Sequence, residues 1–135
     1  MEIFYNNKLV KQNEILTPYE TQHMPQVFLP NTLNKNIYYT LIMYDPDAIH
    51  GTHWHWIVNN INVNGSFILL PYKGPSPPDN KKHRYIFELY SQKHKNDNRI
   101  NFYVRNMSLQ KGKNLLGLLG NPILKFQFLS EKTKV

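Results

Sequence analysis

Residues 37–61, IYYTLIMYDPDAIHGTHWHWIVNNI, hold two apolar runs separated by a turn-forming segment. The runs at residues 37–44 and 54–61 are rich in β-branched and aromatic residues, and they are too continuous for a strand that exposes one face to water. Between them, residues 45–51 contain proline and glycine, which the interior of a strand or helix does not tolerate. The stretch therefore predicts two buried strands of a central sheet.

Further strands are predicted on both sides of this stretch. Residues 84–90 (RYIFELY) form a third run of the same kind, and residues 67–70 form a shorter one after an Asn-Gly turn signal at residues 64–65. Residues 124–129 alternate between apolar and polar, as a half-exposed closing strand does, and residues 27–29 form a short apolar run.

One helix is predicted late in the chain. Ser108 is a suitable N-cap, and Gly120 with the following Asn-Pro ends the helix. Its apolar face would consist of Leu109, Leu115, Leu116 and Leu119. We therefore expect a mostly β protein, sandwich- or barrel-like, with a mainly antiparallel central sheet and one or two peripheral helices. A length of 135 residues predicts a single domain over residues 1–135.

The composition restricts the cellular compartment and the class of binding partner that we expect for this protein. The absence of cysteine excludes disulfides and thiolate metal sites. No secretory signal and no apolar run near the ~20 residues of a membrane span is present, so we expect a cytoplasmic protein. Residues 1–67 carry three Lys or Arg and five Asp or Glu, a net charge of −2, whereas residues 68–135 carry thirteen and four, a net charge of +9. This imbalance favours anionic partners.

The first polar motif is Asp45-Pro46-Asp47, directly after a predicted strand. Aspartates at such a position often only cap the turn through their side-chain oxygens. Alternatively, two carboxylates held rigid by Pro46 point into a cavity. The motif alone does not distinguish the two.

The second motif is a pair of histidines, His53 and His55, which share one face of an extended strand, while Trp54 and Trp56 share the other. Two such imidazoles can bind a metal ion if a carboxylate completes the site. The glutamate that cupins place after the second histidine is missing, because Asn59 and Asn60 stand there. Hydrogen bonding by neutral histidines is the simpler interpretation.

The third motif is His83-Arg84-Tyr85, which follows a stiff, proline-rich loop. His83 and Tyr85 share a face and together offer two hydrogen-bond donors to one anion. Arg84 lies on the opposite face of a predicted core strand, where a charge needs a partner. We expect Arg84 to be buried and paired with Asp45 or Asp47.

Taken together, these segments resemble the phosphatidylethanolamine-binding protein family, which includes Raf kinase inhibitor protein and the plant flowering-time regulators. The family's marks are a DPDxP segment before a His-bearing strand and a GxxPP…HRY segment. Here they read TLIMYDPDAIHGTHWHWIVNNI and YKGPSPPDNKKHRYIFELY, with Ile49 in place of the second proline. Weaker similarity extends the match over residues 13–131.

The resemblance implies a β-sandwich fold and a pocket for phosphate or a phosphoryl headgroup, without catalysis or a cofactor. Carried onto this sequence, the family's pocket would consist of Asp45, Asp47, His55, His83 and Tyr85, with Gly74, Ser76 and Pro77 at the rim.

Three functions follow as hypotheses. The first is a regulatory binding protein for phospholipid headgroups, phosphorylated peptides or small anions, with a kinase or other signalling protein as a possible partner. The second is a metal-dependent enzyme built on His53, His55 and a carboxylate. The third, a nucleic-acid binder, has no recognisable motif. The first accounts for both the polar motifs and the charge.

Overall fold

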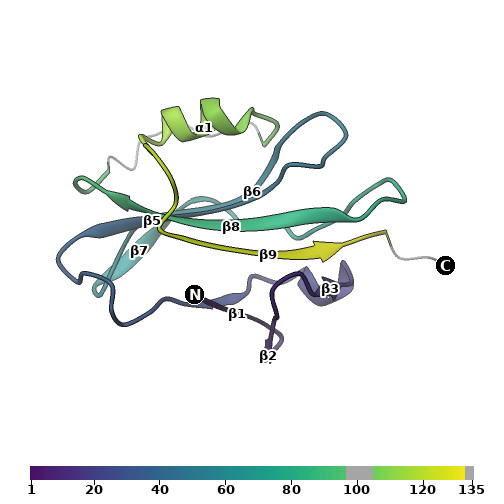
Figure 1. Ribbon diagram of the computed structural model, residues 1–135, viewed down its shortest axis with the longest axis horizontal. Helices are drawn as coiled ribbons and strands as arrows, with labels where there is room; N and C mark the ends of the chain where they lie inside the picture. Colours follow the sequence, from purple (N-terminus) through teal and green to yellow (C-terminus); the bar gives the residue numbers. More distant parts are fainter. Residues whose placement is uncertain (97–104, 133–135) are drawn as a thin grey trace.

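The computed structural model describes residues 1–96 and 105–132, and it places two β-sheets and one helix in three layers (Figure 1). The larger sheet has six strands in the order β3-β9-β8-β5-β6-β7, and the smaller has three in the order β2-β1-β4. A short 3₁₀ helix, η1, follows β3. The elements are β1 (Glu2–Tyr5), β2 (Lys8–Leu9), β3 (Ile15–Leu16), η1 (Tyr19–Thr21), β4 (Gln26–Phe28), β5 (Tyr38–Asp45), β6 (His53–Asn62), β7 (Gly65–Leu70), β8 (His83–Gln92), α1 (Leu109–Leu115) and β9 (Leu124–Ser130).

The predicted central strands are confirmed. β5 pairs antiparallel with both β6 and β8, and nearly all of its residues are buried. This burial on both faces explains the continuous apolar composition of the strand. β9 pairs antiparallel with β8, and from Phe126 to Ser130 its residues alternate between buried and half-buried, as the sequence predicts. The short β3 is parallel to β9.

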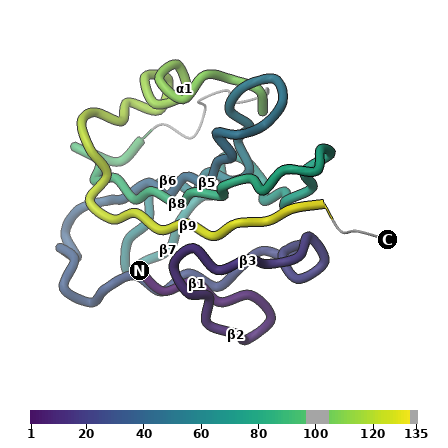
Figure 2. The backbone as a smooth tube through the Cα atoms, turned by 45° about the vertical axis from the view of Figure 1, so that its right-hand side comes forward, coloured from purple at the N-terminus to yellow at the C-terminus, as the bar shows by residue number. Residues whose placement is uncertain are grey.

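Figure 2 shows α1 on one side of the larger sheet and the smaller sheet on the other. An apolar cluster of buried residues lies on each of these two faces. The cluster facing the smaller sheet includes Ile3, Tyr85, Phe87 and Phe128. The cluster facing α1 is built from other residues of the same strands, together with the segment after the helix. The sheet therefore forms the middle layer and supplies side chains to both cores.

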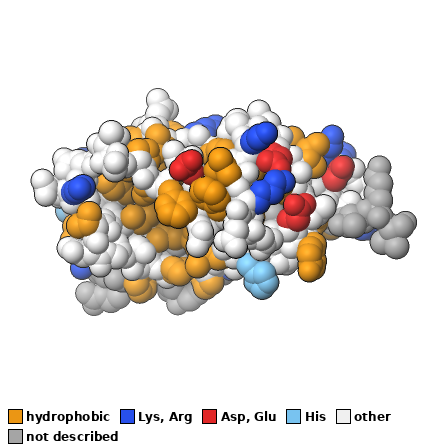
Figure 3. Space-filling view, turned by 90° about the horizontal axis from the view of Figure 1, so that it is seen from below, with side chains coloured by type: hydrophobic (Ala, Val, Ile, Leu, Met, Phe, Trp, Pro, Cys, Tyr) orange, Lys and Arg blue, Asp and Glu red, His pale blue; other side chains and the backbone are white. Residues whose placement is uncertain are grey.

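The smaller sheet was not predicted beyond the run at residues 27–29. Its strands are only two to four residues long, so they carry too little periodicity for a sequence pattern. The connection between β1 and β2 turns through Asn6 and Asn7, both at positive φ. Leu9 and Phe28 of this sheet are exposed. Figure 3, a view from below, shows hydrophobic side chains gathered on this side of the molecule.

The helix begins where the sequence predicts it. The Ser108 hydroxyl accepts a hydrogen bond from the backbone N–H of Lys111, the arrangement of an N-cap. The predicted apolar face is only partly right, because α1 ends at Leu115. Leu116 is buried, but Leu115 and Leu119 are 45% and 71% exposed. The buried residue inside the helix is a glycine.

That glycine is Gly112, which packs directly on the indole ring of Trp54. A Cβ atom at this position would overlap the ring, so only glycine lets the helix approach the sheet this closely. The residue that weakens the helix in isolation therefore allows it to dock.

The predicted ion pair of Arg84 is present, but its predicted burial is wrong. The guanidinium donates two hydrogen bonds to Asp47, at 3.0 Å from Nε and 2.8 Å from Nη2, and the Arg84 side chain is 50% exposed. Arg84 is the second residue of β8, and its side of the strand is exposed at this position and becomes buried only further along the strand. Water therefore solvates the pair.

We expect Gly112→Ala to destabilise the protein. Alanine is the better helix former by up to ~1 kcal/mol, but its methyl group must displace either α1 or Trp54, and overpacking of this kind costs roughly 1–3 kcal/mol. Urea unfolding measures the net loss. Lys111→Ala, at an exposed position of the same helix, is the control and should leave the unfolding midpoint nearly unchanged. Equal midpoints for both variants would contradict the close contact.

Arg84→Ala should change the free energy of unfolding by less than about 1 kcal/mol, because an exposed ion pair contributes little. Asp47 also keeps a hydrogen bond from the backbone N–H of residue 84. Chemical denaturation of wild type and variant tests this expectation. A loss of about 3 kcal/mol or more, the size typical of a stranded buried charge, would show that the pair is not solvated.

Candidate functional site

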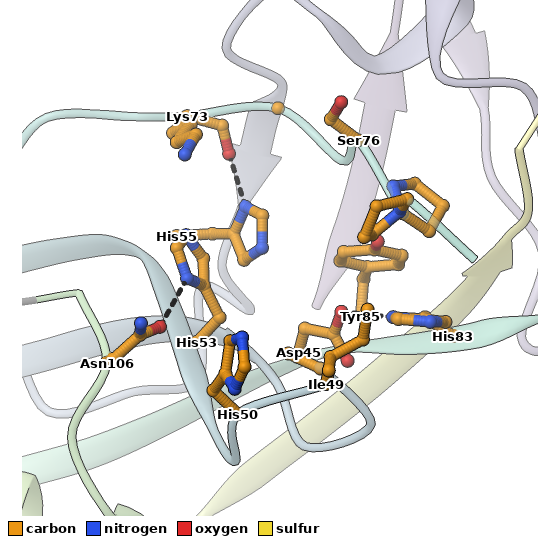
Figure 4. Close-up of a pocket in the computed structure, with 14 residues that line it drawn as sticks. Asp45, Ile49, His50, His53, His55, Lys73, Ser76, His83, Tyr85 and Asn106 are labelled. Carbon is orange, nitrogen blue, oxygen red and sulfur yellow. Dashed lines mark hydrogen bonds and ion pairs between the residues drawn. The ribbon is translucent and has the colours of Figure 1, made fainter.

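A cavity of about 260 Å³ lies where β5 ends and β6 and β8 begin, beneath the proline-rich loop before β8 (Figure 4). It is lined by Asp45, Ala48, Ile49, His50, His53, His55, Lys73, Gly74, Ser76, Pro77, Pro78, His83, Tyr85 and Asn106. The polar residues come from three strands and three connecting segments. Sheet topology therefore assembles the site from segments far apart in the sequence.

A β-bulge in β6 places His55 in this cavity. Tyr44 of β5 pairs with Trp54, and the next residue back, Met43, pairs with Trp56. Between these two pairs β5 advances by one residue and β6 by two, so His55 is the additional, unpaired residue of the bulge. The bulge also breaks the alternation expected from the sequence: Trp54 packs toward α1, whereas Trp56 packs toward the smaller sheet. The prediction that the two tryptophans share a face is wrong.

His55 is a neutral imidazole with a defined tautomer. Its Nδ1 lies 2.6 Å from the backbone carbonyl oxygen of Lys73. Because a carbonyl only accepts, Nδ1 must carry the proton and Nε2 must hold a lone pair. Burial lowers the pKa of His55 to about 3, despite the opposing hydrogen bond to Lys73. The ring therefore stays uncharged at neutral pH.

His53 repeats this arrangement nearer the surface. Its Nδ1 lies 3.0 Å from Oδ1 of Asn106, and its ring meets that of His55 edge-on, with 4.7 Å between the centroids. Burial is the main cause that lowers the pKa of His53, and the cations Lys73 and Arg105 add to it. Both histidines on this wall thus favour the neutral form.

His83 is bonded differently, because both of its ring nitrogens face carboxylates. Nδ1 lies 2.7 Å from Oδ2 of Asp45, and Nε2 lies 2.7 Å from Oδ1 of Asp79. Ionised carboxylates cannot donate, so both nitrogens donate and the ring is an imidazolium. Burial by itself would lower the pKa of His83, but the hydrogen bonds to Asp45 and Asp79 outweigh it and raise that pKa.

Asp45 is the buried carboxylate of the cavity. Its Oδ1 accepts the backbone N–H of Asp47 at 2.7 Å, and its Oδ2 accepts from His83. Burial raises the pKa of Asp45, against these hydrogen bonds. The adjoining phenol of Tyr85 has a raised pKa through burial and the proximity of Asp45, so it remains protonated.

The rim is the loop that enters β8. Gly74 is buried against η1, and a Cβ atom there would lie 2.7 Å from the backbone oxygen of Thr21. This contact fixes the loop over the cavity. Figure 4 shows Lys73 beside His55, and Ser76 across the cavity near Tyr85. The exposed Ile49, which replaces a proline of the family pattern, lies at the mouth.

The cavity brings together most of the predicted site residues. Its lining includes Asp45, His55, Gly74, Ser76, Pro77, His83 and Tyr85. Asp47 instead turns to Arg84 and is not among the lining residues. Sequence analysis missed Lys73, Asn106 and the carboxylate of Asp79. Of these three residues, only Lys73 could have been expected from the sequence, because it lies directly before the proline-rich segment that forms the rim.

The arrangement gives little support to a metal centre. Within residues 1–96 and 105–132, no three His, Asp or Glu side chains are grouped so that they could share one ion. His53 and His55 each use Nδ1 for another contact, and the carboxylate of Asp45 is bonded to His83.

Comparisons with known proteins identify the family and agree with this fold. The family model described as phosphatidylethanolamine-binding protein matches residues 6–119. The rice protein "MOTHER of FT and TFL1 homolog 2" from Oryza sativa subsp. japonica is 31% identical over 103 residues, which cover 69% of this chain and 58% of that protein. The chain thus spans somewhat over half the length of this curated relative.

Solved structures show the same fold. The phosphatidylethanolamine-binding protein from Plasmodium vivax superposes with a TM-score of 0.69 at 19% identity, covering 97% of this chain and 85% of that chain. Its counterpart from Plasmodium falciparum gives a TM-score of 0.58 at 16% identity, with 96% and 84% covered. On the family model, the fold and the motifs that line the cavity, the chain belongs to the phosphatidylethanolamine-binding protein family.

Proposed function

We propose that the protein binds phosphate-bearing groups in the cavity beneath the proline-rich loop. One observation carries the proposal: seven of the eight residues that the family resemblance assigns to an anion pocket line this single cavity. The residues of the family's motifs therefore converge on one polar cavity.

The charges around the cavity are compatible with an anion. The imidazolium of His83 offsets one of the two carboxylates that it contacts, Asp45 and Asp79, and the positive charges of Lys73 and Arg105 outweigh the other. Lys73 contributes an ammonium group at the rim. Behind the wall, the guanidinium of Arg105 donates to the backbone oxygens of Trp54, His55 and Pro71. The net field at the cavity favours a negative ligand.

The same groups support binding rather than catalysis. A general base works best with a pKa near the operating pH, and the pKa of His55 is about 3. Both nitrogens of His83 are held by carboxylates, so this ring has no free position from which to exchange a proton with a ligand.

The cavity volume sets the size of the bound group. At about 260 Å³ it lies below the ~300–1,000 Å³ of pockets for drug-sized ligands. A phosphoryl headgroup or a phosphorylated side chain fits this space, and lipid chains would remain outside. Within the described residues no helix is long and apolar enough to cross a membrane. A signalling protein as partner and a cytoplasmic location stay predictions from the sequence.

Lys73→Ala should weaken phosphate binding roughly three- to tenfold, because it removes the ammonium at the rim. Lys111→Ala is the matched control: it removes the same charge from an exposed helix position, so it changes the net charge equally but leaves the cavity intact. A titration of inorganic phosphate, followed by NMR, gives both dissociation constants and the residues that respond.

In wild type, the perturbed resonances should be those of His53, His55, Ser76 and Tyr85. Shifts that instead cluster around Lys111 and Lys113, with equal losses in the two variants, would mean that phosphate is held by the basic surface and that the cavity is not the site.

A further inference from the structure

We propose that the protein has a second ligand site, an apolar channel between the two sheets that binds a fatty acid with its carboxylate at Lys35. The site is independent of the proposed anion cavity, because no residue lines both. The channel lies near the start of β5, whereas the anion cavity lies at its end. Figure 1 shows the connection from β4 to β5, residues 29–37, at that opposite end of the sheet.

The channel consists of two adjoining cavities, an outer one of about 200 Å³ and an inner one of about 190 Å³. Leu29 and Ile61 line both, so the inner cavity continues the outer one. Together the two reach the lower end of the ~300–1,000 Å³ range of ligand pockets. The other apolar lining residues are Pro30, Leu33, Tyr39 and Val63 in the outer cavity and Val27, Leu41, Trp56 and Val58 in the inner one.

The fold leaves this space open because the smaller sheet is narrow and a bulge turns β6 toward it. The edge strand β4 has only three residues, so the connection after it covers the end of β6. Leu41 of β5 pairs with Val58. Two residues earlier on β5, Tyr39 pairs with Ile61, which is three residues later on β6. The additional residue lets Val58 and Ile61 both pack against the core that faces the smaller sheet.

The outer wall is held in place by the protein itself. The Tyr39 hydroxyl accepts a hydrogen bond from the backbone N–H of Asn34 at 3.1 Å, and Oδ1 of Asn34 accepts from the backbone N–H of Asn36 at 2.8 Å. Tyr39 is buried in the core and anchors this connection to the larger sheet. A pocket that is already formed loses less conformational entropy when a ligand binds.

The polarity of the lining changes along the channel. In the inner cavity, Ser66 and the Trp56 indole are the only polar groups among the described lining side chains. The outer cavity adds the polar side chains of Asn31, Asn34, Lys35 and Asn62. An apolar chain is stabilised by burial at the inner end, and a polar head group finds partners at the outer end. This gradient fits an amphiphile with one chain.

The charge at the outer end specifies the head group. Lys35 is exposed there, and none of the ion pairs among the described residues involves it. No Asp or Glu in the described part of the chain lines either cavity. An ammonium group beside an apolar channel, without a carboxylate to neutralise it, favours an anionic head. A fatty acid supplies both the chain and the carboxylate.

The two tryptophans of the chain provide the test, because Trp56 lines the inner cavity and Trp54 packs toward α1. The probe is ω-bromoundecanoate, whose terminal bromine quenches an indole on contact, titrated below the concentration at which it aggregates. It should quench tryptophan fluorescence saturably in wild type and in Trp54→Phe, but not in Trp56→Phe. Quenching that persists in Trp56→Phe, or wild type without saturable quenching, would overturn the proposal and leave the anion cavity unaffected.

A larger side chain at the junction of the two cavities should block the channel. Ile61→Phe is expected to raise the dissociation constant of the probe at least about tenfold, because the ring occupies the space of the chain. Ile123→Phe makes the same change at an exposed residue outside both cavities and should bind as wild type does. Equal affinities of these two variants would contradict the assignment. If Ile61→Phe does not fold, the tryptophan variants decide.

The head group is tested with ω-bromoundecanol, which has the same chain and no charge. Lys35→Ala should weaken binding of the acid roughly two- to fivefold, the size expected for an exposed ion pair, and leave binding of the alcohol unchanged. Lys111→Ala removes the same charge far from the channel and should change neither. If Lys35→Ala binds the acid as tightly as wild type does, the assignment of the carboxylate to Lys35 is wrong.

Discussion

The site depends on one buried interaction, the imidazolium of His83 held between the carboxylates of Asp45 and Asp79. Asp45 is the last residue of β5, His83 is the first of β8, and Asp79 belongs to the loop between β7 and β8. The interaction therefore joins two central strands and ties the proline-rich loop to them. It also places a positive charge directly beside the buried Asp45, which lines the proposed anion cavity.

A second constraint, the bulge at His55, decides what the cavity offers to a ligand. Without the additional residue, strand alternation would place the side chains of β6 in a different order on the two faces. With it, Trp54 supports α1, Trp56 enters the other core, and His55 reaches the cavity. The carbonyl of Lys73 then fixes the tautomer. The chemistry of the wall is thus set by backbone geometry and not by residue type alone.

The central strands could be predicted because their burial on both faces produces long apolar runs, and the helix start because Ser108 is an N-cap. The smaller sheet could not, since strands of two to four residues leave no periodic pattern. The motifs predicted which residues share a cavity, but not how they are bonded. The two aspartates of DPD have different roles: Asp45 is buried, and Asp47 pairs with the exposed Arg84. Residue spacing carries no information on the bulge, on the bond between Asp79 and His83, or on a glycine at residue 112 that contacts Trp54.

The most direct test of this account is the protonation of the histidine rings, measured through ¹⁵N–¹H correlations on the unliganded protein as the pH is lowered from about 7. The account predicts that His83 carries protons on both nitrogens near neutral pH. It also predicts that His55 carries one on Nδ1 alone and stays neutral until the pH approaches its pKa of about 3. A His83 ring with one proton near pH 7, or a His55 ring that becomes protonated near the ordinary value of about 6.5, would contradict it.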